Sequence, residues 1–71
     1  MSTAELVRSR RLQSGLTQSQ LAARADTTQA VVSRIESGKL SPTVPVLQRL
    51  AAAMDCDVVL AFTPRPSRGD V

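Results

Sequence analysis

The sequence predicts an all-α domain of four short helices that ends in one short β-strand. Three observations support this fold class. Helix-capping residues stand before four successive segments, and apolar residues in the later segments repeat with helical spacing. The last apolar segment, residues 58–62, is too short and too rich in β-branched residues for another full helix. At 71 residues the chain has room for one small domain with a limited core.

The first two helices are predicted to begin at capping boxes, in which a Ser or Thr precedes a Glu or Gln by three residues. Ser2 and Glu5 open a helix that extends to about residue 14, and Thr17 and Gln20 open a second one. Gly15 between them suits the left-handed backbone that ends a helix. The expected inner face of the second helix consists of Leu21, Ala22 and Ala25.

The third and fourth helices are each predicted to begin after a threonine. Thr28 caps the third helix, whose Val32 and Ile35 point inward. Thr43 caps the fourth, and Pro45 fits its first turn because the missing N–H would have no partner there. The expected inner face of the fourth helix is a wide apolar stripe of Val46, Leu47, Leu50, Ala51 and Met54.

Composition narrows the function classes. The net charge is +3, and eight of the nine basic residues are Arg, which suits contacts with phosphates and base edges. With no His and with Cys56 as the only cysteine, an internal disulfide, a metal site, a cofactor and His-based catalysis are not expected. The sequence has no apolar run of membrane-spanning length and no signal-type N-terminus, so we expect a cytoplasmic protein without membrane contact.

Residues 17–38 predict two short helices joined by a tight turn, the second with a polar outer face, which is typical of a part that enters a DNA groove. The residues that carry a family pattern are Arg11, Gly15, Leu16, Thr17, Gln18, Leu21, Ala22, Thr28, Gln29, Val32, Ser33, Arg34, Ile35, Glu36, Gly38, Lys39, Pro42, Leu47, Leu50 and Ala51. Together they resemble the Cro/CI-type (XRE-like) helix-turn-helix family, and closely the phage repressor DNA-binding domains, over about residues 4–56. The chain departs from the family at Asp26 and Asp55, where members usually carry Gly. We expect both Asp residues to adopt the same positive φ.

The resemblance implies that the third helix lies in the major groove and reads bases. Gln29 would bond N6 and N7 of an adenine, and Arg34 would reach a guanine edge or a phosphate. Ala30 and Val31 would lie against thymine methyl groups. Without the surrounding motif, the same side chains would be interpreted as a solvated helix face.

The resemblance also implies phosphate contacts around this helix. Gln18 at the start of the second helix, Ser33 and Lys39 would hydrogen-bond the DNA backbone. Thr17 and Thr28 act first as helix caps and complete the predicted DNA-binding set.

Arg11 and Glu36 correspond to a buried salt bridge that ties the first helix to the third in the phage repressors. Glu36 is therefore interpreted as structural and not as an acid catalyst, and we expect no enzyme activity. Arg8, Arg10 and Arg49 are interpreted as solvated.

Residues 57–63 are predicted to form a dimerisation strand, whose apolar residues are Val58, Val59, Leu60, Ala61 and Phe62. A lone strand cannot satisfy its own backbone groups, so the simplest partner is the same strand of a second copy across a two-fold axis. This ending resembles antitoxins of the HipB type. The alternative is an irregular segment packed on residues 1–56, the helix-turn-helix domain. Residues 64–71 are predicted to be a disordered tail.

Three functions remain distinct. The first is a repressor that binds a palindromic operator in double-stranded DNA as a homodimer. The second is an antitoxin that also neutralises a toxin, for which a HipA-like kinase is one candidate, and regulates its own operon. The third is a protein-interaction module that has lost DNA binding. Gln18, Gln29, Arg34 and Lys39 argue against this third function.

Overall fold

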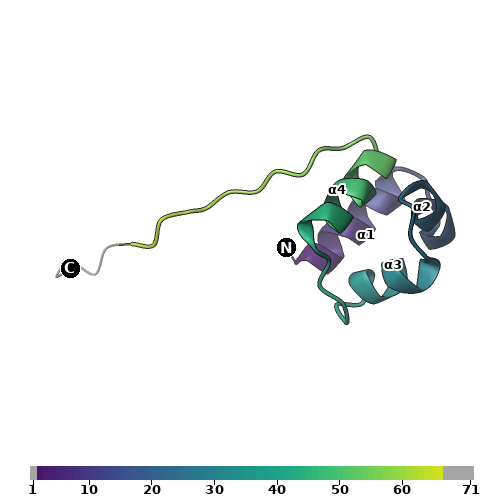
Figure 1. Ribbon diagram of the computed structural model, residues 1–71, viewed down its shortest axis with the longest axis horizontal. Coiled ribbons are helices and arrows are strands. Elements are labelled where there is room, and N and C mark those ends of the chain that lie inside the picture. Colours follow the sequence, from purple (N-terminus) through teal and green to yellow (C-terminus); the bar gives the residue numbers. More distant parts are fainter. Residues whose placement is uncertain (1, 67–71) are drawn as a thin grey trace.

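The computed structural model describes residues 2–66 and contains four α-helices. They are α1 (Thr3–Gln13), α2 (Gln18–Arg24), α3 (Gln29–Glu36) and α4 (Val44–Ala53). Figure 1 shows the four helices gathered into one body, with the residues after α4 running away from it as a single extended segment. The four-helix prediction is confirmed. Within residues 2–66 none of the helices is long and apolar enough to cross a membrane.

All four predicted N-caps are present. Ser2 and Thr17 form complete capping boxes with Glu5 and Gln20, and Thr28 and Thr43 accept hydrogen bonds from the third residue of α3 and α4. Such caps matter here because helices of seven to eleven residues are too short to persist alone in water. Each helix therefore depends on its cap and on packing against its neighbours.

The core lies where α1, α2, α3 and α4 meet. Its fully buried side chains are Leu21 from α2, Val32 and Ile35 from α3, and Leu50 from α4. The remaining buried members of the cluster are Val7, Leu16, Ala22 and Ala25. The predicted inner faces of α2 and α3 are thereby confirmed. On α4 the residues of the predicted stripe differ in burial. Leu50 and Ala51 are buried, whereas Val46, Leu47 and Met54 are half-buried against the cluster.

All four helices end in the same backbone motif. The residue after each C-cap has positive φ, and the next N–H returns to the carbonyl five residues earlier, as in a Schellman motif. Gly15 and Gly38 take the left-handed position after α1 and α3, with φ of 71° and 78°. Asp26 and Asp55 take it after α2 and α4, with φ of 56° and 55°. The expectation that these two residues adopt the backbone of the missing glycines is therefore confirmed.

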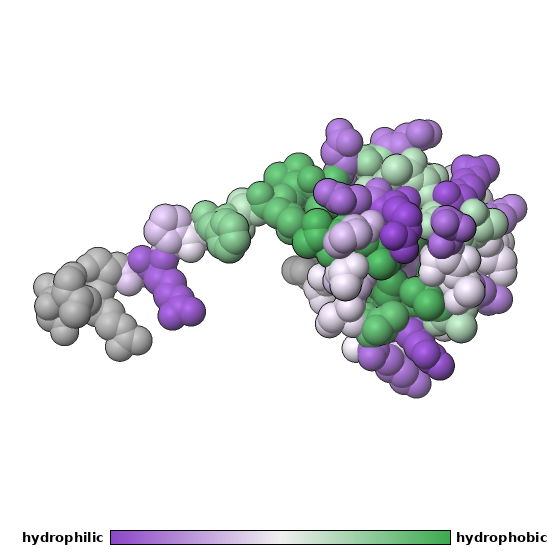
Figure 2. All heavy atoms as spheres, viewed as in Figure 1, coloured by the Kyte–Doolittle hydropathy of each residue, from purple (hydrophilic) through white to green (hydrophobic). Residues whose placement is uncertain are grey.

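The predicted strand is not formed within the single chain. Residues 56–66, which we call the arm, have no regular secondary structure. Val59 and Leu60 are 87% and 64% exposed, and Phe62 is fully exposed. Figures 1 and 2 show the arm leaving the domain, with apolar residues along its first part. The alternative in which residues 58–62 pack on the domain is therefore wrong from Val59 onward. Pairing of this segment with a second copy stays a prediction. Of the predicted tail, residues 67–71 lie outside the described residues.

Candidate nucleic-acid interface

The outer face of α3 is the first component of the site. Because Val32 and Ile35 face the core, the opposite side of this two-turn helix is left to solvent. Gln29, Ala30, Ser33 and Arg34 are all exposed on it. Val31 is half-buried and packs against the core at the edge of that face.

A short turn fixes the position of α3 relative to α2. Only residues 25–28 separate the two helices. The positive φ of Asp26 reverses the chain, and the N–H of Thr27 donates to the Ala22 carbonyl at 2.9 Å. Thr28 then caps α3 through its side chain, which accepts from the N–H of Val31 at 3.3 Å. The first turns of both helices are thus held by side-chain caps and a tight connection.

The predicted ion pair between Arg11 and Glu36 lies behind this surface. Arg11 Nε donates to Glu36 Oε2 at 2.7 Å, and Arg11 Nη2 donates to Oε1 at 2.9 Å. The remaining guanidinium nitrogen, Nη1, donates to the Leu16 carbonyl at 2.9 Å. The two side chains are only 11% and 4% exposed. The pair ties α1 and the turn after it to the end of α3.

Burial alone would raise the pKa of Glu36. The hydrogen bonds from Arg11 and Gln18, together with the positive charges of Arg11 and Arg8, outweigh this effect and hold the pKa below its ordinary value. The hydrogen bond to Glu36 likewise raises the pKa of Arg11, against the opposing effect of burial. Both groups are therefore charged at neutral pH, as an ion pair requires.

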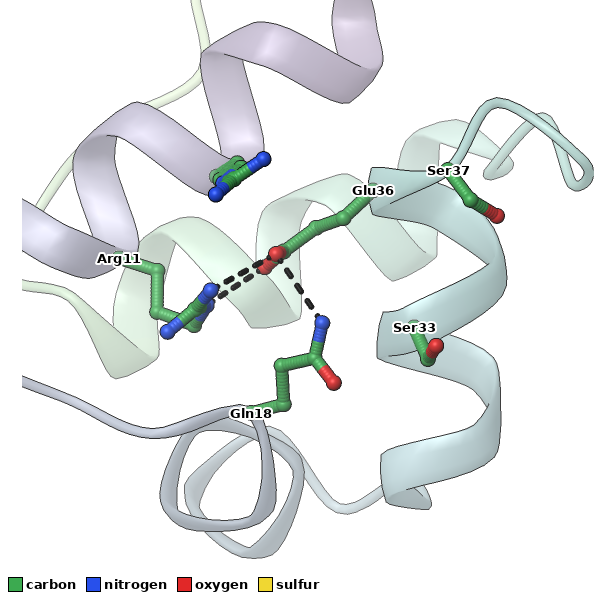
Figure 3. Close-up of a pocket in the computed structure, with 6 residues that line it drawn as sticks. Arg11, Gln18, Ser33, Glu36 and Ser37 are labelled. Carbon is green, nitrogen blue, oxygen red and sulfur yellow. Dashed lines mark hydrogen bonds and ion pairs between the residues drawn. The ribbon is translucent and has the colours of Figure 1, made fainter.

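Gln18 is the first residue of α2 and joins this network. Its Nε2 donates to Glu36 Oε1 at 3.2 Å, so the carboxylate fixes the position of the Gln18 amide beside the ion pair (Figure 3). An amide nitrogen carries two hydrogens, and this bond uses one of them. The second remains available to a phosphate, which accepts hydrogen bonds but does not need to donate them.

A polar, open cavity of about 330 Å³ lies at this junction. Figure 3 shows the side chains that border it, drawn from α1, α2, α3 and the residue after α3. They are Arg8, Arg11, Gln18, Ser33, Glu36 and Ser37. The cavity brings together two predicted phosphate contacts, Gln18 and Ser33, with two residues that were not selected from the sequence, Arg8 and Ser37.

Comparison with known proteins agrees with the fold. The chain matches the sequence profile described as helix-turn-helix over residues 7–60, which is most of its length. The chain belongs to the helix-turn-helix family. Among solved structures it is similar to the P22 c2 repressor protein in complex with a synthetic operator, with a TM-score of 0.74 and 23% sequence identity. The match covers 80% of this chain and 86% of that one. The similarity at this identity concerns the fold, and it confirms the resemblance to Cro/CI-type repressor domains. No match is found among curated proteins.

Five predicted contact residues with polar side chains do not border the cavity, and they fall into two groups. Gln29 and Arg34 on α3, and Lys39 in the loop after it, are exposed and have no side-chain partner among residues 2–66. Thr17 and Thr28 are engaged as caps. The first group is free to bind a ligand, whereas the threonine hydroxyls already accept bonds from their own helices.

Arg49 has a structural contact that was not predicted. Its Nε donates to the Ala25 carbonyl at 3.2 Å and so closes the end of α2. The sequence interpretation left Arg49 in solvent, because the two residues are 24 positions apart and no local pattern connects them.

Proposed function

We propose that this helix-turn-helix protein is a transcriptional repressor that binds a palindromic operator in double-stranded DNA as a homodimer. The observation that carries the proposal is the outer face of α3. It exposes Gln29, Ser33 and Arg34 beside a cation-bearing loop, on a fold similar to that of the P22 c2 repressor, which was solved with operator bound. Placing α3 in the major groove brings Gln29 and Arg34 to base edges and Ser33 to the DNA backbone.

The roles of the individual side chains follow from their chemistry. Gln29 at the N-terminus of α3 carries an amide that can bond N6 and N7 of one adenine, and Arg34 carries a fork suited to guanine or phosphate. Ala30 and the exposed edge of Val31 offer apolar contact to thymine methyl groups. Lys39 and Gln18 flank the helix with phosphate donors. This set reads sequence through α3 and fixes the register through its neighbours.

The homodimer is supported by the arm. Val59, Leu60 and Phe62 are largely exposed and have no partner on their own domain, which is a costly state for apolar side chains and unpaired backbone. Pairing the arms across a two-fold axis would bury them and present two α3 helices to half-sites about 34–36 Å apart. Sedimentation velocity tests this directly: we expect a dimer for the wild type and a monomer for Leu60→Asp/Phe62→Asp. A wild-type monomer bound singly to DNA would remove the dimer from the proposal.

The antitoxin alternative stays a prediction from the sequence. Neither the family match nor the structural match favours it. A toxin would reveal itself as a stoichiometric protein that co-purifies with the native chain.

The function is tested by selecting an operator from random duplex DNA and comparing two variants on it. We expect Gln29→Ala to cost about 1–3 kcal/mol on the selected operator and to relax one base position. We expect Lys39→Ala to weaken binding alike on operator and random DNA, and to lower the salt slope by about 0.9. Failure of the library to yield any preferred sequence would refute sequence-specific binding. An equal loss on every sequence would take base reading away from Gln29.

A further inference from the structure

We propose that the cavity between α1, α2 and α3 receives one backbone phosphate of the DNA, and that Arg8 is the cation that attracts it. This inference rests on the proposed function and adds a contact to it. The sequence interpretation left Arg8 in solvent, whereas the structure places it at the rim of the same cavity as Gln18 and Ser33.

The charges around the cavity identify Arg8 as the residue that matters. Three charged side chains border it, namely Arg8, Arg11 and Glu36. Arg11 and Glu36 neutralise one another through two hydrogen bonds of 2.7 and 2.9 Å. Arg8 is exposed and forms no ion pair with any carboxylate among residues 2–66. The cavity therefore has a net charge of about +1, and Arg8 supplies it.

Glu36 does not prevent an anion from entering. Its side chain is only 4% exposed, and both carboxylate oxygens already accept hydrogen bonds. Oε2 accepts from Arg11, and Oε1 accepts from both Arg11 and Gln18. Glu36 instead acts as a positioning residue, because it holds the Gln18 amide in one orientation and leaves its second N–H unused.

The cavity also contains neutral donors. Gln18 has its second N–H, and the Ser33 hydroxyl has no partner among the described residues. Ser37 is different, since its hydroxyl already donates to the Arg34 carbonyl at 3.2 Å. The cavity of about 330 Å³ is open to solvent, so a phosphate group can approach these donors from outside.

The position of the cavity selects a DNA phosphate as its occupant. Ser33 belongs both to the cavity lining and to the exposed face of α3. A duplex whose major groove holds α3 therefore passes its backbone beside the cavity. A contact of this kind adds affinity and salt dependence but reads no sequence.

The test compares two arginines of α1. Arg8 and Arg10 are both exposed, but Arg10 lies about 200° further around the helix and does not border the cavity. The full chain and its Arg8→Ala, Arg8→Lys and Arg10→Ala variants are titrated by fluorescence anisotropy against a labelled duplex of random sequence over a KCl series. Far-UV circular dichroism checks that each variant is folded.

We expect Arg8→Ala to weaken binding about 5- to 20-fold at low salt and to lower the log–log salt slope by about 0.9. Arg8→Lys should keep most of the slope, because a lysine still meets a phosphate as a point charge. Arg10→Ala should change both quantities much less. Equal effects of Arg8→Ala and Arg10→Ala would overturn the inference while leaving DNA binding intact. Absence of salt-dependent binding by the wild type would instead refute the proposed function itself.

A second experiment locates the phosphate. Single phosphates of the selected operator are replaced by neutral methylphosphonates. At one position in each half-site, replacement should weaken the wild type about as much as Arg8→Ala does. The same replacement should add little to the loss already caused by Arg8→Ala, since both remove one interaction. Additive losses at every position would overturn the assignment.

Discussion

Removing one partner of the Arg11–Glu36 pair is expected to destabilise this domain severely. The carboxylate is 4% exposed, and in Arg11→Met it would keep only the amide of Gln18 as a donor. Breaking a buried ion pair in this way costs about 3–5 kcal/mol, part of which protonation of Glu36 can recover. Domains have about 0.05–0.15 kcal/mol of stability per residue, so this loss is a large share of the total for a chain of 71 residues.

A double variant gives a sharper test, because the reasoning predicts whether it is more or less stable than Arg11→Met. Arg11→Met/Glu36→Leu removes both charges, and we expect it to be more stable than Arg11→Met alone. A residual loss of about 1–2 kcal/mol should remain, because the Leu16 carbonyl and the Gln18 amide lose their partners. In the double variant apolar side chains take the places of side chains that are only 11% and 4% exposed, so no buried charge is left without a partner.

Urea unfolding followed by far-UV circular dichroism measures these differences, since the chain has no Trp or Tyr to report by fluorescence. Two protein concentrations are needed, because dimerisation would make the midpoint depend on concentration. A loss below about 1 kcal/mol for Arg11→Met is the behaviour of an exposed pair and would refute the reasoning. So would a double variant less stable than Arg11→Met.

Three further predictions concern stability. Folding holds the pKa of Glu36 below its ordinary value. The stability that the charged carboxylate contributes is therefore complete above pH 4.5 and is lost as the pH falls from there through the folded pKa. Glu36→Gln should flatten this part of an acid-unfolding profile. Gly15→Ala should lower the free energy of unfolding in urea by about 1 kcal/mol. The cost comes from the φ of 71° alone, because the new Cβ would meet no atom within 4 Å. A loss above 3 kcal/mol would mean a clash that the structure does not contain. Arg49→Ala should cost about 0.5–1.5 kcal/mol by the same measurement, through its lost hydrogen bond to Ala25, and should leave DNA affinity unchanged. A matching drop in affinity would contradict its assignment as a structural residue.

The elements of the fold were predictable because their signals are local. A cap acts on an N–H three residues away, and the positive-φ residue after each helix acts within the same turn. Thr17 and Thr28 therefore identify the starts of α2 and α3 without any knowledge of the core. Local signals alone do not show that Asp26 and Asp55 take the place of glycine. The resemblance to repressors supplied that expectation.

Much of the site depends on contacts between distant residues and could not be read from spacing. The bond from Gln18 to Glu36 joins residues 18 positions apart, and Arg8 borders the same cavity as Gln18 and Ser33 only because α1 packs beside the helix-turn-helix. Sequence patterns assign a long arginine to solvent by default, since its own helix offers no other place for it. Only the packed structure distinguishes Arg8 from Arg10.

The arm shows why a strand can be apparent in a sequence and absent from a single chain. The β-branched, apolar run of residues 58–62 describes side chains that suit a sheet, but a ladder also needs a second backbone. Within residues 2–66 there is no strand to provide one. If a second copy provides it, the arms bury Leu60 and Phe62 and also set the separation of the two α3 helices. Loss of either apolar side chain would then weaken operator binding by weakening the dimer, because a monomer presents α3 to one half-site only.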